Sequence, residues 1–189
     1  MRVSFDLGEQ DLKHFRLIMQ KARQAAKQFG PDEIIEATHK LLEEVRGAKV
    51  PNFIRERLEK LEAMTNMLTD EEWRLPKEEI SRVLNALAYF TEPEDLIPDH
   101  IPGLGFLDDA IMVELVVREL KHEIDAYADF CTFRREEDQR RKKLGKGDQV
   151  TRDEWLDSRR VQLHSRMRKR RRSDKRHRTG NERSPFSLF

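Results

Sequence analysis

Residues 30–68 read GPDEIIEATHKLLEEVRGAKVPNFIRERLEKLEAMTNML, and this stretch determines the fold class of the protein. Pro31 and the two acids that follow it suit the first turn of a helix, where a missing N–H costs nothing and negative charge favours the helix dipole. That helix ends near Gly47, and Pro51 begins another in the same way, through Leu68. Two consecutive helices with clear starts and stops predict an α-helical protein.

A similar signal precedes this stretch. Asp6 and Glu9 have the spacing of a capping box, in which each side chain accepts a hydrogen bond from a backbone N–H at the start of a helix. We expect this first helix to run to about Phe29, because Gly30 follows it.

Two further elements follow the stretch. Thr69 and Glu72 predict a short capped turn around Trp73. Pro76, with two glutamates behind it, predicts a fourth helix that reaches Tyr89 or Phe90.

Residues 91–107 contain prolines and glycines that forbid a continuous helix, so we expect a proline-rich loop there. Asp108 and Asp109 are typical of the cap and the first turn of a fifth helix. This helix is predicted to continue through Phe133 and as far as Leu144.

The C-terminal part begins with a flexible joint at Gly145 and Gly147. Thr151 and Glu154 form another capping box, which predicts a sixth helix over residues 152–172. The chain therefore predicts an all-α fold, a bundle of about five helices with a basic C-terminal helical arm.

The net charge divides the chain into two parts. Residues 1–133 carry a net charge of −10 and residues 134–189 a net charge of +11, although the whole chain has only +1. We interpret residues 1–144 as one helical domain and residues 145–189 as a basic arm that is partly disordered. Such a division is typical of an interaction tail.

Composition excludes several classes of protein. No run of apolar residues is long enough to cross a membrane, and residues 1–7 lack the pattern of a signal peptide, so we expect a cytoplasmic protein. The single cysteine, Cys131, excludes an intramolecular disulfide framework and a cysteine-clustered zinc site. We interpret it as a buried apolar side chain. No catalytic arrangement is recognisable, so we expect no enzymatic activity and no cofactor.

Residues 86–123 read ALAYFTEPEDLIPDHIPGLGFLDDAIMVELVVRELKHE. This run resembles the YkvA-like family, a bacterial domain of unknown function, over about residues 80–124. The matching positions are Pro93, Asp95, Leu96, Ile97, Pro98, Asp99, Pro102, Gly105, Asp108 and Asp109. The resemblance implies a helix, a fixed proline-rich loop and a second helix, without an established activity. Many family members have apolar flanking helices, whereas Glu114 and Arg118 interrupt the second helix here.

The loop carries several acids and no lysine or arginine. In the structural interpretation, Asp95, Asp99 and Asp108 cap turns and helix ends beside the prolines. In the functional one, these residues and Asp109 converge on a protein partner with basic side chains, or on Mg²⁺ or Ca²⁺, which favour oxygen ligands.

Residues 166–178 read RMRKRRRSDKRHR, with nine lysines and arginines and one acid. We expect this segment either to be a solvated tail, to fold back on the acidic part of the protein, or to bind the phosphates of RNA or DNA; anionic lipids are a further alternative. Aromatic residues that would stack on bases are absent from it, so no sequence-specific recognition is indicated. The candidate nucleic-acid-binding residues are Arg166, Arg168, Lys169, Arg170, Arg171, Arg172, Lys175, Arg176 and Arg178.

Three functions remain open from the sequence. The first is a non-enzymatic helical binding module whose arm contacts nucleic acid or a ribonucleoprotein. The second is a metal-dependent hydrolase that uses the loop aspartates. The third is a peripheral membrane adaptor.

Overall fold

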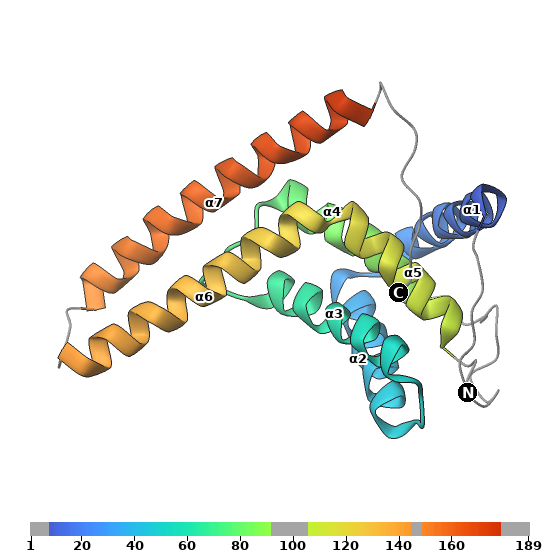
Figure 1. Cartoon of the computed structure of the whole chain (residues 1–189), viewed down its shortest axis with the longest axis horizontal. Helices are drawn as coiled ribbons and strands as arrows, with labels where there is room; N and C mark the ends of the chain where they lie inside the picture. The colour runs from blue at the N-terminus through green and yellow to red at the C-terminus, as the bar shows by residue number, and fades with distance from the viewer. Residues whose placement is uncertain (1–7, 92–105, 145–148, 179–189) are drawn as a thin grey trace. The chain divides into compact units, whose positions relative to one another are not determined.

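The computed structural model describes residues 8–91, 106–144 and 149–178, and these residues form α-helices and 3-10 helices without a strand (Figure 1). The prediction of an all-α fold is confirmed. The described residues group into two compact units. Of the described residues, the first unit contains those up to Thr65 and those within Lys77–Glu119, and the second contains Asn66–Pro76 and those from Leu120 to Arg178.

The first unit contains most of the helices. Their bounds are α1 Glu9–Ala25, the 3-10 helix η1 Ala26–Gln28, α2 Pro31–Gly47, α3 Asn52–Thr69, α4 Lys77–Leu87, the 3-10 helix η2 Ala88–Thr91 and α5 Leu107–Glu119. The end of α3, from Asn66, belongs to the second unit. The predictions for α2 and α3 are confirmed. The predicted fourth helix is present, but its α-helical part ends at Leu87 and η2 follows it to Thr91.

Local hydrogen bonds account for the starts of α1 and α2. The Gly30 N–H donates to Glu33 Oε2 at 2.6 Å, so the acid behind Pro31 does cap the helix. The Gly8 N–H donates to Asp11 Oδ2 at 2.9 Å, and α1 begins at Glu9. Asp6, the predicted capping residue, lies outside the described residues.

The core of the first unit is formed by apolar side chains of its helices, and the first two turns of α5 are buried on every side. Its fully buried side chains include Ile54, Leu58 and Leu61 of α3, Val83 and Leu87 of α4, and Met112, Val113 and Val116 of α5. Asp108 is not the N-cap of α5, contrary to the prediction: the Phe106 carbonyl accepts the first helical hydrogen bond, from Ala110 N at 3.0 Å, so both aspartates lie in the first turn.

The second unit contains α6 Lys121–Leu144 and α7 Gln149–Arg178, which run side by side in opposite directions (Figure 1). The predicted fifth helix is in fact two helices, α5 and α6. The helical conformation is interrupted at Leu120, whose side chain is fully buried. The predicted sixth helix is α7, which is longer at both ends. Thr151 lies inside it, so the predicted capping box at Thr151 and Glu154 is wrong.

Aromatic packing forms the core of the second unit. The fully buried Trp73 packs against the ring of Phe130 at 5.1 Å and that of His164 at 4.2 Å, measured between ring centroids. Leu163 and Met167 of α7 are also buried. Much of the predicted basic arm therefore packs as a helix with an apolar side.

Candidate nucleic-acid interface

The second unit is organised around the turn that follows α3. Asp70 Oδ1 accepts hydrogen bonds from the backbone N–H groups of Glu72 at 2.9 Å and Trp73 at 3.0 Å. Asp70 Oδ2 accepts one from the Tyr127 hydroxyl at 3.0 Å. The predicted turn is present, but its capping residue is Asp70 and not Thr69, whose hydroxyl donates to the carbonyl of Asn66.

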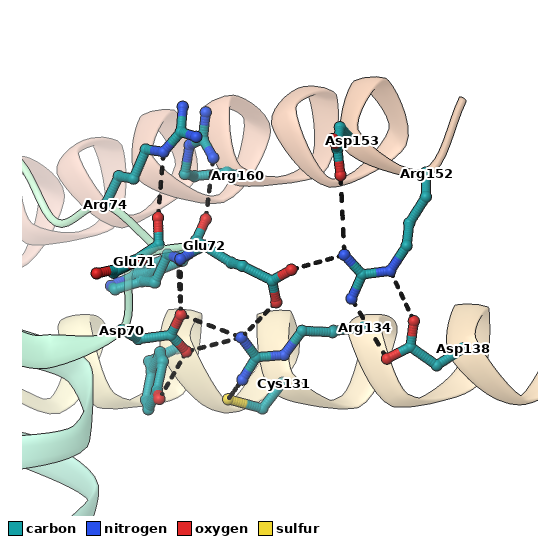
Figure 2. A network of polar contacts seen from close by, with 12 residues as sticks. Asp70, Glu71, Glu72, Arg74, Cys131, Arg134, Asp138, Arg152, Asp153 and Arg160 are labelled. Atoms are coloured by element: carbon teal, nitrogen blue, oxygen red, sulfur yellow. Dashed lines mark hydrogen bonds and ion pairs between the residues drawn. The ribbon is translucent and has the colours of Figure 1, made fainter. Parts of the chain in front are cut away.

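Glu72 of this turn contacts both long helices, α6 and α7 (Figure 2). Its carboxylate accepts hydrogen bonds from Arg134 of α6 at 2.9 Å and from Arg152 of α7 at 2.6 Å. Arg152 also donates to Asp138 of α6 at 2.8 Å. Arg160 of α7 donates to the Glu72 carbonyl at 2.9 Å. The turn, α6 and α7 are thus joined by charge-assisted hydrogen bonds.

These contacts change the acidity of the carboxylates. Burial raises the pKa of Asp70, but the Trp73 N–H, the Tyr127 hydroxyl and Arg134 together outweigh burial and lower that pKa below its ordinary value. The hydrogen bond from Arg152 lowers the pKa of Glu72 and also that of Asp138. All three groups are therefore ionised at neutral pH, and Glu72 and Asp138 hold the N-terminal half of α7 against α6 through Arg152.

The C-terminal half of α7 carries the basic segment, and acids of α6 pair with part of it. Arg171 contacts Glu123 at 2.8 Å, and the Glu123 side chain is fully buried. Arg166 lies 3.8 Å from Asp129. Within the chain that the structure describes, part of the basic segment therefore does fold back on acidic residues, as one of the predicted alternatives required.

The cations of the basic segment, residues 166–178, differ in exposure. Lys169, Arg170, Arg172 and Lys175 are exposed, whereas Arg166, Arg168 and Arg171 are half-buried. The side chains of Arg176 and Arg178 lie outside the described residues. We call the four exposed residues, Lys169, Arg170, Arg172 and Lys175, the basic cluster.

The predicted loop site is described only at its end. Pro93, Asp95, Leu96, Ile97, Pro98, Asp99 and Gly105 lie outside the described residues, and the roles predicted for them stay predictions. Asp108 and Asp109 are buried in the first unit, with exposed fractions of 1% and 6%. Among the described residues, no group of three or more histidine, cysteine or acidic side chains is arranged to hold a metal ion.

The match to a known protein family lies in the first unit. Residues 80–115 match the family described as "Protein of unknown function (DUF1232)". The uncharacterized membrane protein YkvA of Bacillus subtilis (strain 168) is 39% identical to this chain over 67 residues. Residues 80–115 form a YkvA-like segment. It includes most of α4, all of η2 and most of α5, so the predicted resemblance is confirmed.

The similarity covers only part of this chain and only part of YkvA. It covers 32% of this chain and 61% of YkvA, so the chain spans less than two thirds of that relative. No solved structure matches the chain. None of the described helices combines the length and the apolar character that crossing a membrane requires. The YkvA-like segment does not include α7, and the function of α7 has to be argued from its own residues.

Proposed function

We propose that this protein is a non-enzymatic binding module whose helix α7 contacts the phosphates of RNA or DNA without sequence specificity. The observation that supports this function is the basic cluster, four exposed cations within residues 169–175. Arg166 and Arg171 beside them already pair with acids of α6. Among the described cations of residues 166–178, the cluster is thus the part that is exposed to an anionic ligand.

The dimensions of the cluster suit a nucleic-acid backbone. Six helical steps span about 9 Å at roughly 1.5 Å per residue. Duplex DNA carries one charge per about 1.7 Å of its axis, so about five phosphates, divided between the two strands, lie along that length. Successive residues turn by about 100°, which distributes the cations around the helix and presents no fixed pattern for reading bases. This geometry favours non-specific, salt-dependent binding.

The test compares two full-length variants with the same change in charge. In the first, Lys169, Arg170, Arg172 and Lys175 are changed to Gln. In the second, four exposed cations of the first unit are changed to Gln: Lys13, Arg16, Lys21 and Lys49. Binding of fluorescently labelled RNA and duplex DNA is followed by anisotropy between 50 and 200 mM salt, conditions over which counterion release changes affinity strongly.

We expect the wild-type affinity to fall with salt, and the first variant to bind at least about tenfold more weakly with a log–log salt slope smaller by about 3. The control variant should bind within about twofold of the wild type, since nonlocal surface charges are screened at these salt concentrations. Absence of binding by the intact protein, or an equal loss in both variants, would contradict the proposal.

A second candidate ligand is an anionic membrane surface. It is favoured by the name of the relative, which calls YkvA a membrane protein, together with the basic cluster. Sedimentation with phosphatidylserine vesicles tests it, and binding to these vesicles without any binding to RNA or DNA would replace the first proposal. For either ligand we propose a cytoplasmic location.

A further inference from the structure

One tryptophan of the second unit is exposed. The chain has two tryptophans, Trp73 and Trp155. Trp73 is fully buried, but Trp155 of α7 is 50% exposed. The Arg140 guanidinium of α6 lies over the Trp155 ring, 5.9 Å from its centroid. An indole held beside a guanidinium at the surface is a flat platform on which another ring can stack.

Trp155 shares one side of α7 with several cations. At about 100° per residue, Trp155, Arg159, Arg166, Lys169 and Arg170 fall within a sector of about 100°. We call these five residues the Trp155 stripe. From Trp155 to Arg170 the stripe extends about 22 Å along the helix axis at roughly 1.5 Å per residue. The stripe therefore joins the aromatic platform to two members of the basic cluster.

Contacts with α6 hold the stripe in place. The Arg159 guanidinium lies 5.4 Å from the centroid of the Phe133 ring, and Arg166 lies 3.8 Å from Asp129. Together with the pair of Arg140 and Trp155, these contacts occur in antiparallel order along the two helices. Arg166 faces the α6 acid Asp129. At about 100° per residue, the exposed Glu136 falls on the same side of α6 as Asp129.

An exposed tryptophan beside several cations is more than phosphate binding alone requires. Contacts with phosphates need only cations, whereas an exposed aromatic ring can stack on a base whose face is not already covered. In a duplex the bases are already stacked on their neighbours, so a side chain on the surface of a helix cannot reach their faces without unstacking them. In a single strand the faces are accessible.

We infer that the Trp155 stripe binds single-stranded nucleic acid, with Trp155 stacked on an unpaired base and Arg159, Lys169 and Arg170 contacting the backbone. This inference rests on the proposed function and deepens it, because it selects single strands over duplexes. It also assigns a role to an aromatic residue that lies outside the basic segment of the sequence.

The test uses the full-length protein, its Trp155→Leu and Trp155→Phe variants, and Val161→Ala as a control. Val161 is 59% exposed on α7 but lies outside the stripe. Each protein is titrated with a labelled 20-nucleotide oligo(U) and with a mixed-sequence duplex of 20 base pairs, and both anisotropy and tryptophan emission are recorded.

We expect oligo(U) to quench the emission of the wild type. Trp155→Leu should bind oligo(U) about 5- to 150-fold more weakly, in line with the stacking energy of one base, and should bind the duplex like the wild type. Trp155→Phe should retain part of the affinity, and Val161→Ala all of it. If Trp155→Leu binds oligo(U) as the wild type does while binding still depends on the basic cluster, only this inference is overturned. If no nucleic acid binds, the proposed function fails with it.

Discussion

At the scale of single residues, Asp70 determines how the chain leaves α3. Its carboxylate accepts two backbone N–H groups of the turn and also contacts Tyr127 and Arg134 of α6. We expect Asp70→Ala to lower the free energy of unfolding by about 2–4 kcal/mol, because a cap is worth about 1 kcal/mol and a partly buried ion pair is broken as well. A urea titration followed by tryptophan emission measures this change.

Thr69→Ala is the matched control, since Thr69 is the neighbour that the sequence pattern selected as the cap. Thr69 is exposed and its hydroxyl donates a local hydrogen bond of 3.4 Å to the Asn66 carbonyl, so we expect a loss below about 0.5 kcal/mol. A larger loss for Thr69→Ala than for Asp70→Ala would show that Thr69 is the cap.

Acidification provides a second readout of the Asp70 variant. The pKa of Asp70 is lowered in the folded protein, so the stabilisation is present above the pKa of the unfolded chain and is lost as the pH falls through the folded value. Between about pH 4 and pH 2 the wild type should therefore lose more stability than Asp70→Ala does.

The sequence could predict the turn but not its cap. Thr69 and Glu72, and equally Asp70 and Trp73, are three residues apart, and local spacing cannot choose between them. The choice is made by Tyr127 and Arg134, which are 57 and 64 residues away along the chain. Contacts at that separation leave no periodic signal in one sequence.

At the scale of helices, features with a local sequence signal could again be predicted, whereas a feature without such a signal was missed. The bounds of α2 follow from Pro31, its acids and Gly47, which are all local signals. The interruption between α5 and α6 at Leu120 could not be predicted, because no glycine or proline lies there. The packing of α7 did leave a signal, because Leu156, Leu163 and Met167 are spaced by seven and four residues and are all buried. The high charge of the arm obscured that pattern.

The docking of the C-terminal half of α7 depends on Arg171. Removing its side chain leaves the fully buried Glu123 without one of its charged contacts. We expect Arg171→Ala to lower the free energy of unfolding by about 1–3 kcal/mol, less than for a fully buried pair because Arg171 is 28% exposed. Chemical denaturation measures the energy, and hydrogen exchange should show faster exchange in α7.

Arg172→Ala removes the same charge one residue further along, from an exposed position. We expect its free energy of unfolding to lie within about 0.5 kcal/mol of the wild type. Equal destabilisation by the two variants would mean that the net charge of the helix matters and that the contact with Glu123 does not.

At the scale of the whole molecule, the two compact units do not follow the order of the sequence. The second unit takes the turn Asn66–Pro76 from the middle of the chain and packs it with α6 and α7. The change of net charge near residue 133 therefore falls inside α6, within one unit. As a result, Glu123 and Asp129 of the acidic part pair with Arg171 and Arg166 of the basic part.

This arrangement predicts that the arm cannot be removed without damage to the fold. A chain that ends at Leu144 lacks the buried apolar side chains of α7, Leu156, Leu163 and Met167, each worth roughly 1.5–3 kcal/mol. The total is comparable with the stability of a whole domain, about 5–15 kcal/mol. We expect the truncated protein to have a lower melting temperature and red-shifted emission from Trp73, its one remaining tryptophan.

Circular dichroism and fluorescence during heating measure both effects. The control is the full-length variant with Gln at the four positions of the basic cluster, which keeps the buried side of α7 and should melt within a few degrees of the wild type. An unchanged melting temperature with buried Trp73 emission in the truncated protein would contradict the packing of α7. With the expected result, loss of nucleic-acid binding on truncation would carry no information about the arm, because the unit that presents the arm would itself be unfolded.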